Sequence, residues 1–192
     1  ILKKINRNKY YILQTFTSPT IYEQQKQNPL FDYSCYHPYD FIWKSYSFFK
    51  KLKPYKYIIT RHDIWPNHII ICKLLNIPIY YINANIHKNS IWLKPIIISL
   101  SKFIFPFINY IFVPSTRIQK NIMMLNTNII VTGDSRFDQI LERKTKNTKP
   151  LLPNKYQKTK NIIFGSYDQV DEKIILSALS KSFPNGEEDL MQ

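Results

Sequence analysis

Short apolar runs recur along most of the chain, and amphipathic or polar stretches separate them. Runs that are rich in aromatic and β-branched residues are typical of buried strands. The pattern predicts strands at residues 9–17, 32–37, 55–60, 77–85, 109–114 and 128–133. Strands that alternate with helices over this length indicate an α/β fold with a parallel sheet.

The stretches between the predicted strands carry helix signals. Ser18 followed by Pro19 predicts an N-cap and a first-turn proline. Helices are expected over residues 20–27, 65–75 and 115–125, and a long helix is expected to run from Ser90 into the strand at 109–114.

A further helix is expected to begin after Asp40. The Asp40 side chain is predicted to cap it, and Pro54 to end it. Phe41, Phe48 and Leu52 recur at helical spacing, so they are predicted to form its buried face.

The alternation stops at residues 144–160, which are rich in lysine, threonine and proline and have no apolar period. This composition predicts a linker. After it, residues 161–166 are expected to form a strand and residues 169–182 an amphipathic helix. The expected organisation is therefore a first α/β domain over 1–143 and the first βα unit of a second, truncated domain over 161–192. The chain begins at Ile1 and ends in a stretch that closes no recognisable element, so we expect both ends to be cut.

The net charge of +14 and the pI of about 9.7 indicate an anionic partner, which is a nucleic acid, a phosphorylated substrate or an acidic membrane surface. The lysines are scattered rather than clustered, so an AT-rich coding sequence explains the composition equally well. The chain carries no recognisable nucleic-acid-binding signature, and we expect no nucleic-acid partner.

Cys35 and Cys72 lie far apart, with no histidine at metal-ligand spacing. This argues against a zinc site and a disulfide framework, and it favours a reducing, cytoplasmic setting. The longest apolar run, residues 91–113, is interrupted by two lysines and two prolines, so we interpret it as a buried helix rather than a membrane span. Contact of this run with a membrane surface is the alternative.

Polar side chains follow two of the predicted strands. Arg61, His62 and Asp63 come after one strand, and Asn83 and Asn85 come after the next, with His87 close behind. The carboxyl ends of parallel strands form the crevice in which α/β folds bind ligands. These residues are therefore candidates for binding or catalysis.

Three motifs, taken in order, resemble the Kdo transferases, glycosyltransferases that add 3-deoxy-D-manno-octulosonic acid (Kdo) to lipid A. The motifs are RHDIWPN, NANIHKNS and VTGDSRFDQI, which resemble the family's E-T-E-L-W-P-N, N-A-R-x-S and T-G-N-x-K-F-D. ILQTFTSPTIYE also resembles the family segment T-x-T-P-T-G, and GSYDQVDEKIILSAL resembles its second-domain opening, G-S-T-H-x-x-E-E.

The resemblance implies a GT-B glycosyltransferase with a Rossmann-like acceptor domain over residues 1–143 and a nucleotide-sugar domain that begins at 161. It implies an inverting transfer from CMP-Kdo to a lipid A precursor in lipopolysaccharide biosynthesis, without metal or cofactor. It also implies a peripheral or anchored position at the cytoplasmic face of the bacterial inner membrane. The family's general base is a glutamate in a G-E motif, which has no counterpart after Ile1, so we expect this chain by itself to be inactive.

Residue by residue, the resemblance implies acceptor-binding roles for Asp63, Asn83 and Ser90. Arg61 replaces a family glutamate, so it is expected to contact an anionic phosphate of the acceptor instead. Arg136 and Ser166 are the implied donor-binding residues.

Some candidates have a structural alternative. Asp63 also suits the N-cap of the helix near Trp65, and Arg136 suits a surface ion pair with Asp134 or Asp138. Asn85 and Tyr167 depart from the family pattern, and His87 has no partner at ligand spacing, so it is interpreted as a solvated loop residue.

Two other functions stay open from the sequence. One is an inactive, truncated paralogue that binds anionic lipid through its lysines, with a steep dependence on salt. The other is a GT-B glycosyltransferase that uses a different donor sugar.

Overall fold

The computed structural model describes residues 2, 5–145, 156, 161–166 and 168–183 of the 192-residue chain. Contacts divide the chain into two compact units, residues 1–138 and 139–192. The strands are β1 (Leu13–Phe16), β2 (Tyr33–Tyr36), β3 (Tyr57–Thr60), β4 (Ile79–Ile82), β5 (Tyr110–Val113) and β6 (Ile129–Val131). The helices are α1 (Pro19–Gln25), α2 (Ile42–Leu52), α3 (Pro66–Leu74), η2 (Ile91–Leu93), α4 (Ile98–Ile104), η3 (Phe105–Phe107), α5 (Thr116–Ile122), α6 (Ser135–Thr145) and α7 (Gln169–Ser182).

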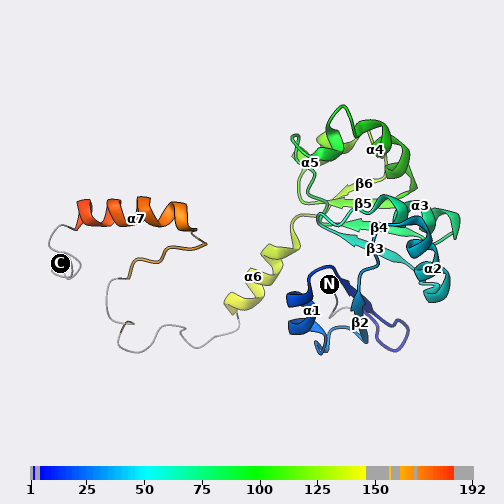
Figure 1. The fold of residues 1–192 in the computed structure, drawn as a ribbon, viewed down its shortest axis with the longest axis horizontal. Helices are drawn as coiled ribbons and strands as arrows, with labels where there is room; N and C mark the ends of the chain where they lie inside the picture. The colour runs from blue at the N-terminus through cyan, green and yellow to red at the C-terminus, as the bar shows by residue number, and fades with distance from the viewer. Residues whose placement is uncertain (1, 3–4, 146–155, 157–160, 167, 184–192) are drawn as a thin grey trace. The chain divides into compact units, whose positions relative to one another are not determined.

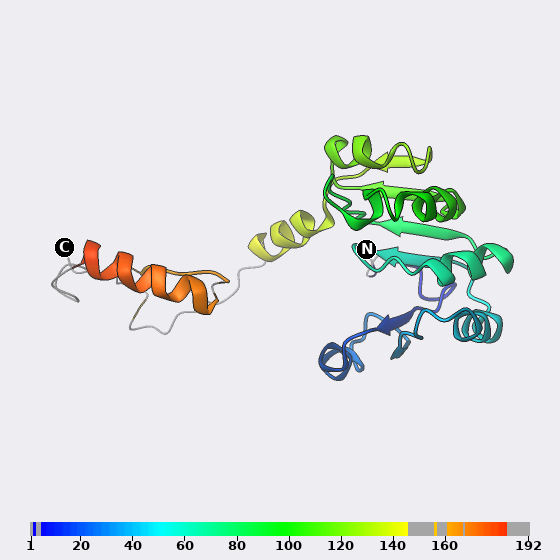
Figure 2. The same cartoon turned by 45° about the horizontal axis from the view of Figure 1, so that its top comes forward.

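The first unit contains two parallel sheets. Strands β3 to β6 form a four-stranded sheet in the order β3-β4-β5-β6, and β1 pairs with β2 in a separate sheet. The blue β1–β2 segment lies beyond the β3 edge of the larger sheet (Figures 1 and 2). The predicted α/β class with a Rossmann-like parallel sheet is confirmed.

One face of the four-stranded sheet carries the core. Ile59, Tyr81 and Ile111 point from three neighbouring strands into this face and are at most 2% exposed. Ile69 of α3 and Ile118 of α5 are buried in the same cluster. Each such side chain contributes about 1.5–3 kcal/mol through burial, so this face dominates the stability of the unit.

Local signals fix several helix starts. The Ser18 hydroxyl accepts a hydrogen bond from the Ile21 N–H at the start of α1, and Pro19 lies in the first turn, as predicted. Ser115 caps α5 in the same way. Helix α3 begins with Pro66, but its N-cap residue Trp65 makes no side-chain capping bond.

The prediction for α2 was wrong in two respects. Asp40 does not cap this helix, because its carboxylate accepts a hydrogen bond from the Asn67 N–H at the start of α3. The buried side chains of α2 are Ser45 and Phe49, whereas Phe41 is 51% exposed. The helix packs against α3, and Phe49 contacts the His68 ring of that helix at a centroid distance of 5.3 Å.

The long helix expected from Ser90 is also wrong. The segment is divided into η2, α4 and η3, because Pro95 and Pro106 interrupt the backbone hydrogen bonding of a continuous helix. Among the described residues, no helix combines the length and apolar character needed to cross a membrane.

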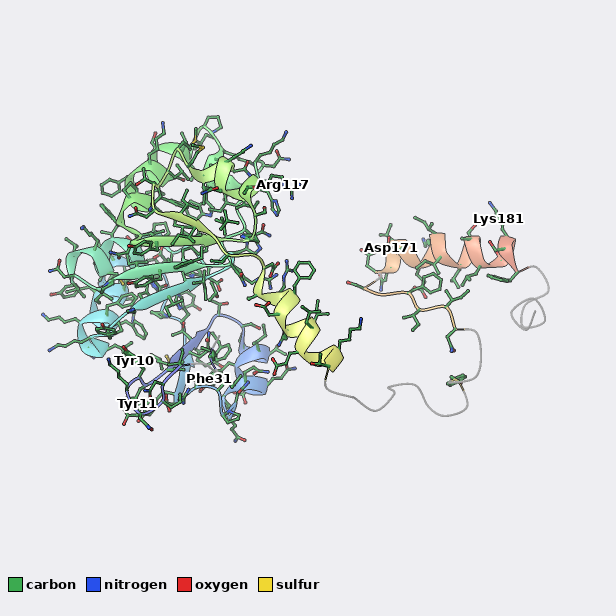
Figure 3. The ribbon with its side chains drawn as sticks, turned by 180° about the vertical axis from the view of Figure 1, so that it is seen from behind. Tyr10, Tyr11, Phe31, Arg117, Asp171 and Lys181 are labelled. Atoms are coloured by element: carbon green, nitrogen blue, oxygen red, sulfur yellow. The ribbon has the colours of Figure 1, made fainter. Side chains whose placement is uncertain are left out.

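The second unit contains α7, as predicted. Asp171 and Lys181 lie near its two ends (Figure 3). The strand expected at 161–166 does not form, and Ile163 is 77% exposed. A strand needs a neighbour to bond its backbone groups, and no described residue supplies one there. Helix α6 extends to Thr145, two residues into the expected linker; most of that linker lies outside the described residues.

The different burial of two residues on α2 gives a stability test. Phe49→Ala removes a ring that packs edge-on against Phe48 and Tyr57 at centroid distances of 5.2 and 5.0 Å. We expect the free energy of unfolding, measured by urea denaturation, to fall by about 3–5 kcal/mol. Leu52→Ala is the control, because Leu52 is 42% exposed, and it should cost less than about 1 kcal/mol. Equal losses would contradict this assignment of the buried face.

Candidate functional site

The chain turns sharply where β3 and β4 end. Arg61 has φ 54° and Asn83 has φ 50°, and each directly follows its strand. The Arg61 N–H donates to the Ile82 carbonyl at 3.1 Å, which extends the pairing of the two strands to these turns. Left-handed backbone costs about 1–2 kcal/mol for most residues. The sheet thus holds both turns in a conformation that the isolated residues would avoid.

Asn83 joins the end of β4 to the start of α6. Its amide nitrogen donates to the Ser135 hydroxyl at 2.6 Å, and its amide oxygen lies 3.5 Å from the Ser135 N–H. Between β6 and α6, Gly133 adopts φ 80°, a conformation that favours glycine. Gly133 thus allows the chain to turn tightly between the strand and the helix.

Asp134 and Arg136 form an ion pair beside these turns. The Arg136 Nε lies 2.8 and 3.0 Å from the two Asp134 carboxylate oxygens, and a terminal guanidinium nitrogen also contacts the carboxylate. Hydrogen bonds from Arg136, with a smaller effect from the Arg61 charge, lower the pKa of Asp134 to about 2. Asp134 is therefore ionised near neutral pH and holds Arg136 in place.

These residues share a small pocket of about 40 Å³ at the carboxyl ends of the strands. It is lined by Arg61, Asn83, Asn85, Pro114, Asp134 and Arg136. Two guanidinium groups and two amides offer many donors, while the one carboxylate is already bonded. The pocket is suited to hold an anion or sugar hydroxyls and contains no nucleophile.

The pocket brings together three of the predicted site residues, Arg61, Asn83 and Arg136. The predicted alternative for Arg136, a pair with Asp134, is present as well. Sequence reasoning did not identify Asp134 as part of a site. The signal was available, because an acidic residue right after a strand-ending glycine lies at the same sheet edge as the other candidates.

Asp63 lies elsewhere. It lines a larger cavity of about 190 Å³ between β1 and β3, together with Thr17, Ser18, His37 and Trp65. Its predicted alternative as a helix cap is wrong, because the N-cap residue of α3 is Trp65 and the Asn67 N–H in its first turn donates to Asp40 instead. The structure thus separates Asp63 from Arg61, although the two are neighbours in the sequence.

Ser90 and Ser166, the two serines predicted as binding residues, line neither cavity. Ser90 precedes η2 and makes no capping bond there. Ser166 has φ 60° in the second unit, and the cap of α7 is Asp168, whose carboxylate accepts from the Val170 and Asp171 N–H groups. Asp168 therefore already bonds the N–H groups next to Ser166 that could otherwise face an anion.

The described residues contain no group of three or more histidine, cysteine, aspartate or glutamate side chains that could hold a metal ion. His87 is exposed in a loop, as predicted.

A comparison with known families decides the relationship. The family model described as 3-deoxy-D-manno-octulosonic-acid transferase (kdotransferase) matches residues 1–139. The chain belongs to the Kdo transferase family. The match ends within the first turns of α6, so it covers both sheets and both cavities of this glycosyltransferase domain. A search of curated proteins finds no match.

Two histidines of the Kdo transferase domain lie in an aromatic cluster beside the larger cavity. The rings of His37 and His68 are 4.5 Å apart, and His68 also packs against Phe49 at 5.3 Å. His68 is fully buried. Burial, and to a lesser extent the neighbouring His37, lowers the pKa of His68 to about 3, and burial also lowers the pKa of His37. Both rings are therefore neutral in the folded protein near neutral pH.

This cluster makes stability depend on pH. The unfolded chain binds protons on these histidines below about pH 6.5, whereas the folded chain does not, so stability falls as the pH drops below that value. For His68 alone, the free energy of unfolding should be about 2 kcal/mol lower at pH 5 than at pH 7.5. Urea denaturation at several pH values measures this change.

His68→Phe should flatten the dependence, because phenylalanine keeps the ring packing and cannot bind a proton. His87→Gln, at an exposed position, is the matched control and should leave the dependence unchanged. An unchanged pH dependence in His68→Phe would refute the role of this ring.

Proposed function

We propose that this chain is the acceptor-side part of an enzyme that transfers Kdo from CMP-Kdo to a lipid A precursor. The observation that carries the proposal is the pocket of Arg61, Asn83 and Arg136 at the strand ends of a Kdo transferase domain. The reaction is inverting and needs no metal or cofactor. A carboxylate takes the proton of an acceptor hydroxyl, that oxygen attacks the anomeric carbon, and CMP leaves with the bonding electrons.

The acceptor-binding residues are Arg61, Asp63, Asn83 and Ser90. The Arg61 guanidinium suits a phosphate of the acceptor, because its donors match two oxygens at once. The Asn83 amide, already fixed by Ser135, suits a sugar hydroxyl. Asp63 is exposed at the rim of the larger cavity, where it accepts hydrogen bonds from hydroxyls.

The donor-binding residues are Arg136 and Ser166. Arg136 suits the carboxylate or the phosphate of CMP-Kdo, and its bond to Asp134 sets the direction of its remaining donors. A donor anion competes with Asp134 for this guanidinium. We therefore expect donor binding to weaken the ion pair between Asp134 and Arg136, because this guanidinium is not free before the donor binds.

The proposed organisation is an acceptor domain over residues 1–143, a linker over 144–160 and the start of a GT-B nucleotide-sugar domain over 161–192. The net charge of +14 supports a peripheral position on anionic lipid at the cytoplasmic face of the inner membrane. Residues 1–192 by themselves are expected to be inactive, since the resemblance assigns the general base to a motif that they do not contain.

The natural reading frame that encodes this chain provides the test. Purified enzyme given CMP-Kdo should release CMP only when a phosphorylated lipid A precursor is added. Arg61→Ala and Arg136→Ala should each lower kcat/KM by roughly ten- to a hundredfold, as expected for the loss of one charge-assisted contact.

Arg117→Ala is the control, because Arg117 is exposed on α5 and does not line the pocket (Figure 3). An equal loss in all three variants would refute the assigned roles. If no CMP is released with or without the acceptor, and the protein binds phosphatidylglycerol vesicles in a salt-sensitive way, the protein is instead an inactive lipid-binding paralogue. If the enzyme instead releases the nucleotide of a different nucleotide sugar that is supplied in place of CMP-Kdo, it uses another donor sugar.

A further inference from the structure

We propose that Arg61, Asn85 and Asp134 form a coupled set of residues that determines which anionic groups the small pocket binds. In this set the turn after β3 supplies a cation of the pocket in place of the loop after β4, and Asp134 supplies the carboxylate. The inference rests on the proposed function, because it refines the binding site for the charged groups of the substrates. It adds Asn85 and Asp134 to the residues that determine specificity.

Three departures from the Kdo transferase motifs meet in this pocket. Arg61 stands where the motifs have glutamate, Asn85 where they have arginine, and Asp134 where they have asparagine. The three residues belong to three different motifs, yet all of them line the same pocket of about 40 Å³. Each departure changes a formal charge, so any one of them by itself alters the electrostatics of the pocket.

The three departures together keep the balance of charge. In the motifs, the positions of Arg61 and Asn85 hold a carboxylate and a guanidinium. In this chain the guanidinium comes from Arg61 and the carboxylate from Asp134. Arg136, where the motifs have lysine, adds a second cation. The pocket therefore still combines two cations with one carboxylate, and the cations are in excess for an anionic group of a ligand.

The Tyr81 side chain explains how a guanidinium can come from either position. Tyr81 is fully buried. Its hydroxyl donates to the Arg61 carbonyl and accepts a hydrogen bond from the Asn85 backbone N–H. The backbone at both positions thus surrounds one hydroxyl, although Arg61 follows β3 and Asn85 lies beyond β4. A long arginine side chain reaches the same pocket from either place.

Asp134 interacts with the relocated cation. Hydrogen bonds from Arg136 are the main cause of the lowered pKa of Asp134, and the charge of Arg61 adds to it. The carboxylate therefore reduces the repulsion between the two guanidinium groups. The Asn85 amide is neutral and shorter than an arginine side chain, so it leaves room for Arg61 and adds no third cation.

This arrangement makes each member of the set depend on the other two. Arg61→Glu alone places two carboxylates beside one guanidinium, so the pocket repels anions. Asn85→Arg then returns the missing cation, and Asp134→Asn removes the extra carboxylate. We expect reversal of all three residues to restore binding, whereas reversal of Arg61 alone abolishes it.

Kinetics of the complete natural polypeptide test the coupling. With CMP-Kdo and a lipid A precursor, Arg61→Glu should lower kcat/KM at least about a hundredfold. The triple variant Arg61→Glu/Asn85→Arg/Asp134→Asn should recover to within about tenfold of the natural enzyme. Arg117→Glu is the control, because it reverses an exposed charge outside the pocket (Figure 3), and it should leave kcat/KM unchanged.

A milder pair of variants tests the relocated cation by itself. Arg61→Gln removes the guanidinium without adding a carboxylate, and Arg61→Gln/Asn85→Arg supplies the guanidinium from the other position while Asp134 stays in place. The single variant should lose at least about tenfold in kcat/KM, and the double variant should regain it. Recovery in neither the triple nor the double variant would overturn the proposal.

Binding of inorganic phosphate to the same polypeptide tests the set without either substrate. Followed by NMR at the Arg136 Nε–H, phosphate should bind at least about tenfold more weakly to Arg61→Gln than to the natural protein. Arg61→Gln/Asn85→Arg should regain the affinity. This pattern in an enzyme that releases no CMP would contradict the proposed function alone. Equal phosphate binding by all three proteins, or none by the natural protein, would overturn the coupled set.

Discussion

The parallel hydrogen bonding of β3, β4, β5 and β6 is the constraint on which the rest of this domain depends. It ends all four strands at one edge and continues past the strands through the Arg61 N–H and the Ile82 carbonyl. The turns that follow β3 and β4, at Arg61 and Asn83, both have left-handed backbone and lie next to each other. The small pocket exists because the sheet brings these turns together with the turn that follows β6.

Charge balance then sets the character of the pocket. Asp134 lies among the guanidinium groups of Arg61 and Arg136 and is bonded directly to Arg136. The carboxylate stabilises two nearby cations that would otherwise repel each other, and it leaves part of their donor capacity open. A site of this kind binds an anion by exchange, so its affinity depends on how well the ligand competes with Asp134.

The larger cavity has a different origin. It lies between two sheet edges rather than at the strand ends, and its lining combines backbone groups with an aromatic and histidine cluster. Packing of this cluster explains the burial of His68, while the neighbouring edges of β1 and β3 lack strand partners within the described residues. Asp63 belongs to this environment, so the motif that contains Arg61 and Asp63 contributes to two separate places.

The sequence by itself determined the order of the strands along the chain, the α/β class and the cap at Ser18, because these depend on residues that are close together in the chain. Its motifs also sufficed for the family. Only the tertiary structure decided which face of α2 is buried, that prolines divide the segment after Ser90, that residues 161–166 form no strand, and that Asp134 meets Arg61 and Arg136. Periodicity allows several buried faces, and the choice among them depends on which distant element packs there. Contacts between strand ends likewise depend on sheet order, which local patterns do not specify.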